Sequence, residues 1–149
     1  MSVTRVDFYV LPDASAQGRA LLACRLTEKA YARGHSVFLN TESAQQTRQM
    51  DELLWTFRQG SFVPHAPVQD TRPPRPPVII GQECPPQLNA EVLVNLAPEI
   101  PSFTERFERI VELVDQNEDT LRHARERYSR YRERGYSLES HKVSAQDHG

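Results

Sequence analysis

Short apolar runs and amphipathic helical segments follow one another along the chain. Residues 6–10 alternate apolar and polar positions and are followed by LPD at 11–13, a pattern that predicts a strand ending in a turn. Apolar residues then recur at helical spacing over 15–33, up to Gly34, and glycine commonly follows the C-terminus of a helix. Three later apolar runs are typical of strands buried in a parallel sheet; they are 37–39, 78–80 and 92–96.

Two further segments have helical periodicity. The first begins at a capping residue, Thr41 or Ser43, and runs to about residue 58. The second spans 103–114, where apolar residues fall at i, i+4, i+7, i+8 and i+11, which predicts an amphipathic helix that covers the sheet. This alternation predicts an α/β fold: a single domain over 1–136, with a mostly parallel sheet of at least four strands flanked by helices, and a frayed polar tail over 137–149.

A proline-rich segment interrupts the alternation. Eight of the eleven prolines lie between residues 64 and 86, including RPPRPP at 72–77. Proline fixes the backbone and removes an amide donor, so this segment is predicted to be a surface connection that leads into the strand at 78–80. An alternative is that RPPRPP is an extended ligand for an aromatic groove.

The composition is ordinary for a globular protein of 149 residues, with 38% hydrophobic and 26% charged residues. No apolar run approaches the ~20 residues that cross a bilayer, and the N-terminus has no basic segment followed by a long apolar one. We therefore expect no membrane span and a cytoplasmic protein. The two cysteines, Cys24 and Cys84, form no CxxC motif and are expected to be buried or partly buried thiols.

Motifs of catalysis and cofactor binding are missing from the sequence. The six glycines form neither GxGxxG nor GxxxxGK[ST], so no nucleotide-binding loop is expected. The five histidines form no HExxH and no ligand spacing with a cysteine. Acidic residues are scattered over different predicted elements, which gives no positive support for paired-carboxylate catalysis. We expect a non-enzyme without a cofactor or metal.

The last predicted helix, 118–134, concentrates basic charge beside an aromatic stripe. Four residues share one face of it at about 100° per residue: Leu121, Ala124, Tyr128 and Tyr131. Arg125 and Arg132 run along the edge of this face, with Arg122 further round. Residues 122–134 hold six arginines against two glutamates, a net charge of +4 in a chain of net charge −2. The helix therefore suits an anion that carries an aromatic group.

Two alternatives remain open for this helix. Its apolar stripe can pack on the core while the arginines snorkel at the edge, with no ligand. Its arginines and tyrosines can also grip phosphates and stack on the bases of a single-stranded nucleic acid. The negative charge of the rest of the chain disfavours a DNA-coating surface.

The only tryptophan, Trp55, falls outside the apolar face of the second predicted helix and is followed by SFVPH at 61–65. Aromatic residues at the end of a helix commonly lock a loop onto the core. Alternatively, Trp55 and Phe62 anchor a protein partner, because tryptophan is over-represented at interface hot spots.

Three segments together resemble one known family. They are VDFYVL at 6–11, DELLWTFRQGSFVPH at 51–65 and ARERYSRYRERGY at 124–136. Their order and spacing are similar to those of the chi subunit of bacterial DNA polymerase III holoenzyme, a clamp-loader accessory protein. The resemblance implies a three-layer Rossmann-like fold that binds no nucleotide, a non-catalytic role in DNA replication, and two protein-binding surfaces.

The first implied surface receives the acidic C-terminal tail of single-stranded DNA-binding protein (SSB), which ends in Pro-Phe with a free carboxylate. The residues that the resemblance places there are Arg122, Arg125, Tyr128, Ser129 and Arg132. Ser129 departs from the family pattern, in which a basic residue is typical at this position.

The second implied surface binds the psi subunit of the clamp loader or, in competition, an iron-sulfur repair helicase. Its residues are Trp55, Phe62, Val63 and Pro64. The chain would then link SSB to the polymerase assembly and contact DNA only indirectly. A direct single-stranded nucleic-acid-binding domain is the alternative function, supported only by the arginines and tyrosines of 118–134.

Overall fold

Strands and helices alternate in this computed structural model, which describes residues 4–86 and 88–143. The strands are β1 (Arg5–Val10), β2 (Val37–Asn40), β3 (His65–Pro67), β4 (Val78–Gly81), β5 (Val92–Asn95), β6 (Arg109–Val114) and β7 (Ser137–Lys142). The helices are α1 (Ala16–Ala32), α2 (Ala44–Thr56) and α3 (Glu118–Glu133), with the 3-10 turns η1 (Val68–Asp70) and η2 (Thr104–Arg106). All predicted strands are confirmed, as are all predicted helices except one.

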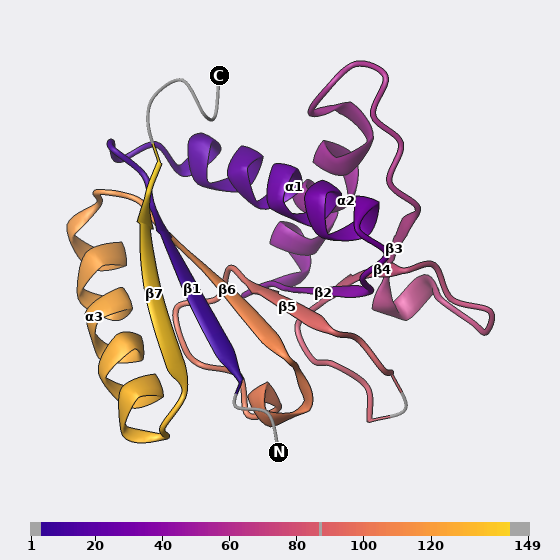
Figure 1. Ribbon diagram of the computed structural model, residues 1–149. Helices are drawn as coiled ribbons and strands as arrows, with labels where there is room; N and C mark the ends of the chain where they lie inside the picture. Colours follow the sequence, from indigo (N-terminus) through magenta and orange to yellow (C-terminus); the bar gives the residue numbers. More distant parts are fainter. Residues whose placement is uncertain (1–3, 87, 144–149) are drawn as a thin grey trace.

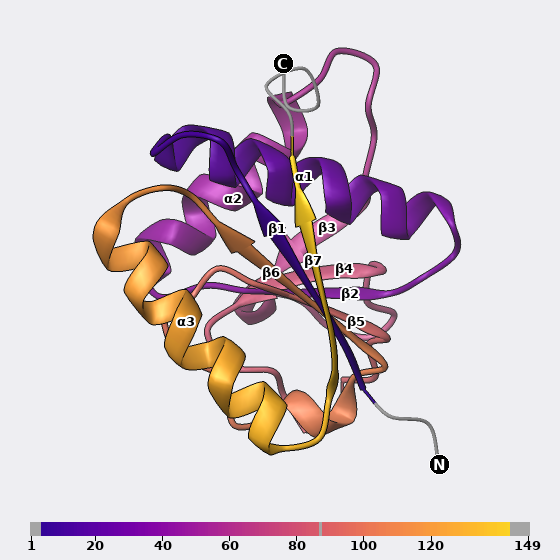
Figure 2. The same cartoon turned by 60° about the vertical axis from the view of Figure 1, so that its left-hand side comes forward.

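The seven strands form one sheet in the order β3-β4-β2-β5-β6-β1-β7, and all neighbouring strands are parallel. α1 and α2 cover one face of this sheet and α3 covers the other (Figure 1). Figure 2 shows the strands passing between α1 and α3. The predicted three-layer α/β fold is therefore confirmed.

Side-chain caps explain where the three helices begin. The capping residues are Ser15, Ser43 and Asn117. Each accepts a hydrogen bond from an amide that has no partner within its helix. Of the two caps predicted for α2, Ser43 is the one used, with 3.1 Å between its hydroxyl and the Gln46 amide. None of the helices in the described residues is long and apolar enough to cross a membrane.

The core has two halves, one on each face of the sheet. Successive side chains of a strand point to opposite faces, so Phe38 of β2 lies on the α3 side while Val37 and Leu39 lie on the side of α1 and α2. Both cysteines are buried, as predicted. Burial raises the pKa of the Cys24 thiol to about 12, so this thiol is an inert part of the core.

The amphipathic helix predicted over 103–114 is wrong. Residues 104–106 form η2 and 109–114 form β6, which lies between β1 and β5. A strand covered on both faces is apolar at nearly every position, so a short buried strand also satisfies a helical pattern. β-branched residues such as Ile110 and Val111 favour the strand. Tertiary burial on both sides therefore decides the structure here.

The frayed tail predicted over 137–149 is also wrong in its first part. Residues 137–142 form β7, which pairs with β1 along its whole length, from Arg5 opposite Ser137 to Val10 opposite Lys142. This strand is polar because it lies at the edge of the sheet, where most of its side chains are exposed. Residues 144–149 lie outside the described part of the chain. The sequence pattern also fails to predict β3, a short edge strand that ends in Pro67.

Candidate functional site

Three large hydrophobic side chains are exposed among the described residues: Trp55 (52%), Phe62 (66%) and Tyr128 (37%). Burying a side chain such as phenylalanine stabilises a fold by about 1.5 to 3 kcal/mol, so rings left at the surface are candidates for contact with another protein. Trp55 and Phe62 lie together, with 5.9 Å between their ring centroids. Tyr128 belongs to α3, on the other face of the sheet. There are therefore two candidate surfaces.

The α3 surface consists of the five residues that the sequence singled out on this helix. All five are exposed: Arg122, Arg125, Tyr128, Ser129 and Arg132. The Tyr128 ring rests on Phe8 of β1, with 5.4 Å between the ring centroids and 53° between the ring planes. Phe8 is itself buried and packs edge-on against Tyr131 at 6.1 Å. One side of Tyr128 is thus fixed to the core, and the rest of the ring is open to a ligand.

The arginine charge of the α3 surface is largely unpaired. Arg125 and Arg132 form no ion pair with any described residue, whereas Arg122 lies 3.3 Å from a carboxylate oxygen of Asp119. An exposed pair of this kind contributes only about 0.3 to 0.5 kcal/mol, so it competes weakly with an incoming anion. Guanidinium groups bind carboxylates through two parallel hydrogen bonds. The α3 surface therefore combines an aromatic platform with groups that bind a carboxylate.

Arg127 is the arginine of α3 whose role the sequence pattern missed. It is only 3% exposed, and its Nε donates to Glu112 at 3.0 Å while Nη1 donates to the Pro98 carbonyl at 2.8 Å. The Tyr131 hydroxyl donates to the other oxygen of Glu112 at 2.7 Å, and burial together with Glu112 raises the pKa of Tyr131. Helical spacing from the buried Ala124 and Tyr131 would have identified this position. Arg127 belongs to the core and not to the α3 surface.

The Trp55–Phe62 surface is built on the end of α2 and the loop that follows it. The Trp55 ring also packs on His65 of β3, with 4.5 Å between the ring centroids. His65 is buried, and its ring nitrogens lie 2.6 Å from the Val63 carbonyl oxygen and 2.9 Å from that of Asp51. These contacts make His65 a structural support beneath the tryptophan.

The four residues predicted for the Trp55–Phe62 surface differ in their exposure to solvent. Trp55 and Phe62 are both exposed. Pro64 is half-buried. Val63 is 1% exposed and packs in the core on the side of α1 and α2. Val63 therefore anchors the segment and presents no side chain to a partner.

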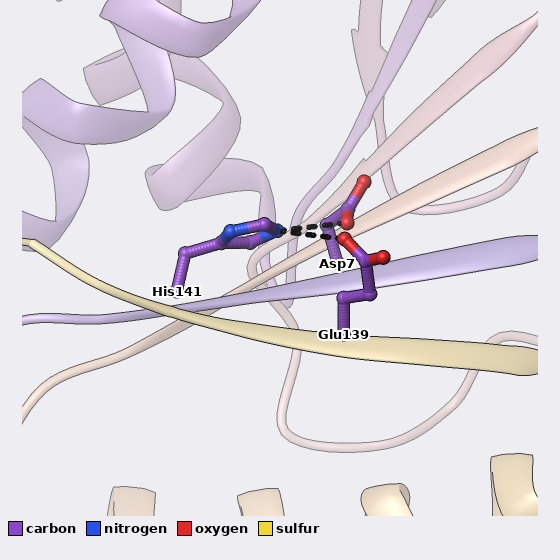
Figure 3. A group of neighbouring side chains, drawn as sticks. All are labelled: Asp7, Glu139 and His141. Carbon is purple, nitrogen blue, oxygen red and sulfur yellow. Dashed lines mark hydrogen bonds and ion pairs between the residues drawn. The ribbon is translucent and has the colours of Figure 1, made fainter.

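A third group of side chains, on β1 and β7, has the composition of a metal site. Ligand atoms of Asp7, Glu139 and His141 lie within 4.8 Å of one another (Figure 3). The Asp7 carboxylate already lies 2.9 Å from His141 Nε2, 2.7 Å from Arg109 Nε and 3.2 Å from Arg5 Nε. Two guanidinium groups beside a carboxylate repel a metal cation. These side chains instead form an ion-pair network that joins β7 to β1 and β6.

This network keeps Asp7 ionised in the interior. Burial of the side chain alone would raise its pKa, but the hydrogen bonds from His141, Arg109 and Arg5 outweigh burial and lower the pKa below its ordinary value of 3.8. The sequence pattern could not reveal the network, because only the pairing of β1 with β6 and with β7 brings these residues together.

Comparison with known proteins gives consistent matches over nearly the whole chain. A family model described as "DNA polymerase III chi subunit, HolC" matches residues 3–139. The chain is 38% identical over 141 residues to the DNA polymerase III subunit chi of Pseudomonas aeruginosa. The matched region covers 95% of this chain and 98% of that protein. It is 31% identical over 138 residues to the subunit chi of Haemophilus influenzae, covering 92% and 96%. It is 28% identical over 136 residues to that of Escherichia coli, covering 88% and 92%. The resemblance carried by the three sequence segments is confirmed.

Proposed function

The chain belongs to the DNA polymerase III chi subunit family, and on that premise we propose that it is a non-catalytic adaptor in DNA replication. The α3 surface binds the acidic C-terminal tail of SSB. The Trp55–Phe62 surface binds the psi subunit of the clamp loader or an iron-sulfur repair helicase. The adaptor thereby links SSB-coated DNA to the polymerase assembly or to the helicase, and touches DNA only indirectly.

The observation that carries this proposal is the position of the exposed aromatic side chains. The large hydrophobic residues exposed in the described part of the chain are Trp55, Phe62 and Tyr128, which are the aromatic residues that the family resemblance assigned to partners. Trp55 belongs to α2 and Tyr128 to α3, and these helices cover opposite faces of the sheet. This separation supports an adaptor that holds two partners at once.

The chemistry of the α3 surface suits a peptide that ends in phenylalanine with a free carboxylate. The terminal phenyl ring needs an apolar contact, which the Tyr128 ring on Phe8 provides through tilted aromatic packing. The terminal carboxylate needs a bidentate donor, which the guanidinium of Arg125 supplies, because no residue that the structure describes pairs with it. Acidic residues before the terminus are attracted by Arg122 and Arg132, over a range of about 8 to 10 Å at moderate salt.

The Trp55–Phe62 surface suits a folded partner better than a charged tail. Its two rings are 52% and 66% exposed and lie side by side, so they present a wide apolar area. Tryptophan is among the residues that contribute most to interface affinity. Because Trp55 is already packed on the fixed ring of His65, less side-chain entropy is lost when a partner binds.

An adaptor with these two surfaces works by raising effective concentration. SSB-coated DNA displays several tails close together, so a chain that leaves one tail rebinds a neighbouring tail before it diffuses away. A weak contact with each single tail is then enough to keep the second partner near the DNA.

Fluorescence anisotropy with a labelled SSB tail peptide tests the proposal. We expect saturable binding to the full chain, loss of binding when the terminal phenylalanine is removed, and moderate weakening as salt rises. A labelled single-stranded oligonucleotide tests the alternative function. Tight oligonucleotide binding with a steep salt dependence, together with no binding of the tail, would favour a direct nucleic-acid binder.

A further inference from the structure

A groove of about 890 Å³ lies between α1, the loop after α2 and the C-terminal end of β7. Its walls come from segments far apart in the sequence, including Leu22 of α1, Phe62 of the loop and Val143 after β7. Phe62 also belongs to the Trp55–Phe62 surface. The groove is therefore continuous with that surface.

One side of α1 forms a wall of the groove. Four of the lining residues recur at helical spacing on this helix: Leu22, Arg25, Leu26 and Lys29. Leu22 is buried, Leu26 is half-buried and Lys29 is exposed. The wall thus has an apolar base bordered by cations, a pattern that complements a peptide with both apolar and acidic side chains.

Positive charge dominates the groove. Four cations line it against one carboxylate, in a chain of net charge −2: Arg25, Lys29, Arg58 and Lys142 against Glu28. Glu28 is already neutralised, because Arg58 lies 2.8 Å from its Oε2 and the Ser61 hydroxyl donates to the same oxygen. Within the described residues, the other three cations form no ion pair. The local field therefore favours a negatively charged ligand.

Arg25 gives a second indication of a ligand. Its Nη1 is buried and has no hydrogen-bond partner among the residues that the structure describes. Leaving a buried donor without an acceptor costs free energy. Arg25 lines the groove, so a rotation of its guanidinium toward a carboxylate bound there would supply that acceptor.

We propose that this groove binds an extended acidic segment with one bulky apolar side chain, and that the segment belongs to the protein that docks on the Trp55–Phe62 surface. The inference rests on the proposed function of that surface, because Phe62 is common to both. The carboxylates of the segment meet the cations of α1 and β7. Its apolar side chain lies against Leu22 and Leu26.

The probe is a short synthetic peptide of aspartate and glutamate with one central phenylalanine and an amidated C-terminus. The amide removes the free carboxylate that the α3 surface is proposed to bind, and the full chain carries Arg125→Ala to weaken that surface further. Against this background, Lys29→Glu combined with Lys142→Glu should weaken peptide binding by roughly tenfold or more. Arg48→Glu combined with Arg72→Glu reverses two exposed charges outside the groove; it is the matched control and should leave the affinity unchanged.

Equal peptide affinity in the groove variant and in the Arg48→Glu, Arg72→Glu control would overturn the proposal. A dimer in sedimentation that the groove substitutions dissociate would also overturn it, because the occupant would then be a second copy of the chain. Trp55→Ala distinguishes this inference from the proposed function, since Trp55 does not line the groove. That variant should still bind the peptide but lose psi or the helicase; partner docking that survives Trp55→Ala would contradict the proposed function alone.

Discussion

The ring of Tyr128 on α3 packs against the ring of Phe8 on β1, with 5.4 Å between the centroids. Phe8 is 3% exposed and Tyr128 is 37% exposed, so a buried residue of the sheet supports a surface residue of the helix. β1 lies between β6 and β7 in the sheet. The aromatic platform of the α3 surface is therefore held by the core, and a ligand need not order it on binding.

Tyr128→Ala and Arg125→Ala should each weaken binding of the SSB tail peptide. The first removes the aromatic platform, and the second removes a charge-assisted contact with a carboxylate. Loss of such a contact costs about 1.5 to 3 kcal/mol, roughly ten- to a hundredfold in affinity. Fluorescence anisotropy with the labelled peptide measures the change.

Two control variants accompany this test. Tyr128→Phe keeps the ring and should retain most of the affinity. Arg130→Ala removes an exposed arginine of the same helix that is outside the α3 surface, and should change the affinity much less than Arg125→Ala. Unchanged tail affinity in both Tyr128→Ala and Arg125→Ala would refute the assignment of the tail to α3.

Trp55→Ala or Phe62→Ala should abolish association with psi or the helicase and leave the affinity for the SSB tail unchanged. Substitutions at distant sites with no shared partner act independently, and α2 and α3 lie on opposite faces of the sheet. Pull-down with the purified partner and anisotropy with the tail peptide measure the two contacts separately. A folded Phe62 variant that lost both contacts would indicate one shared site.

The sequence predicts correctly those elements whose signals lie within their own residues. The sequence predicts α3 because acidic residues begin it, a glycine follows it and its apolar residues recur at helical spacing. In the structure that glycine, Gly135, has a φ of +82°. The local pattern of β6 predicts a helix because the burial of this strand depends on β1 and β5, which the local pattern does not contain. The strand order was not predictable for the same reason: Arg5 lies opposite both Arg109 and Ser137 only after long-range pairing.

In the candidate site, too, the sequence predicts features that depend on local pattern and misses those that depend on long-range contacts. The sequence predicts that Trp55, Phe62 and Tyr128 contact partners, and all three side chains are exposed. Arg127 is one of the six arginines counted over 122–134, because charge alone does not reveal its buried partner, Glu112 of β6. A count of arginines therefore overstates the positive charge that a ligand of α3 can reach.

Glu112→Gln should destabilise the fold by about 3 to 5 kcal/mol, because it leaves the buried guanidinium of Arg127 without its charged partner. Urea denaturation at neutral pH measures the loss. The double variant with Arg127→Met should recover part of it, since replacing both members of a buried pair by uncharged groups costs less than removing one. A double variant less stable than Glu112→Gln alone would show that Arg127 stabilises the fold independently of Glu112.

Asp7→Asn should lower the free energy of unfolding by about 3 kcal/mol at neutral pH, and the effect should shrink in acid. The folded-state pKa of Asp7 lies below its ordinary value of 3.8. Its ionised form therefore stabilises the fold fully above about pH 3.8, and this contribution is lost as pH falls through the lower, folded pKa.

Glu28 and Glu91 also have lowered pKa values, so acid lowers the free energy of unfolding of both the wild type and the Asp7→Asn variant. The difference between wild type and variant isolates Asp7, and urea denaturation from pH 7 down to about pH 2.5 measures it. A difference that stays constant over that range would mean that Asp7 acts through packing and not through its charge.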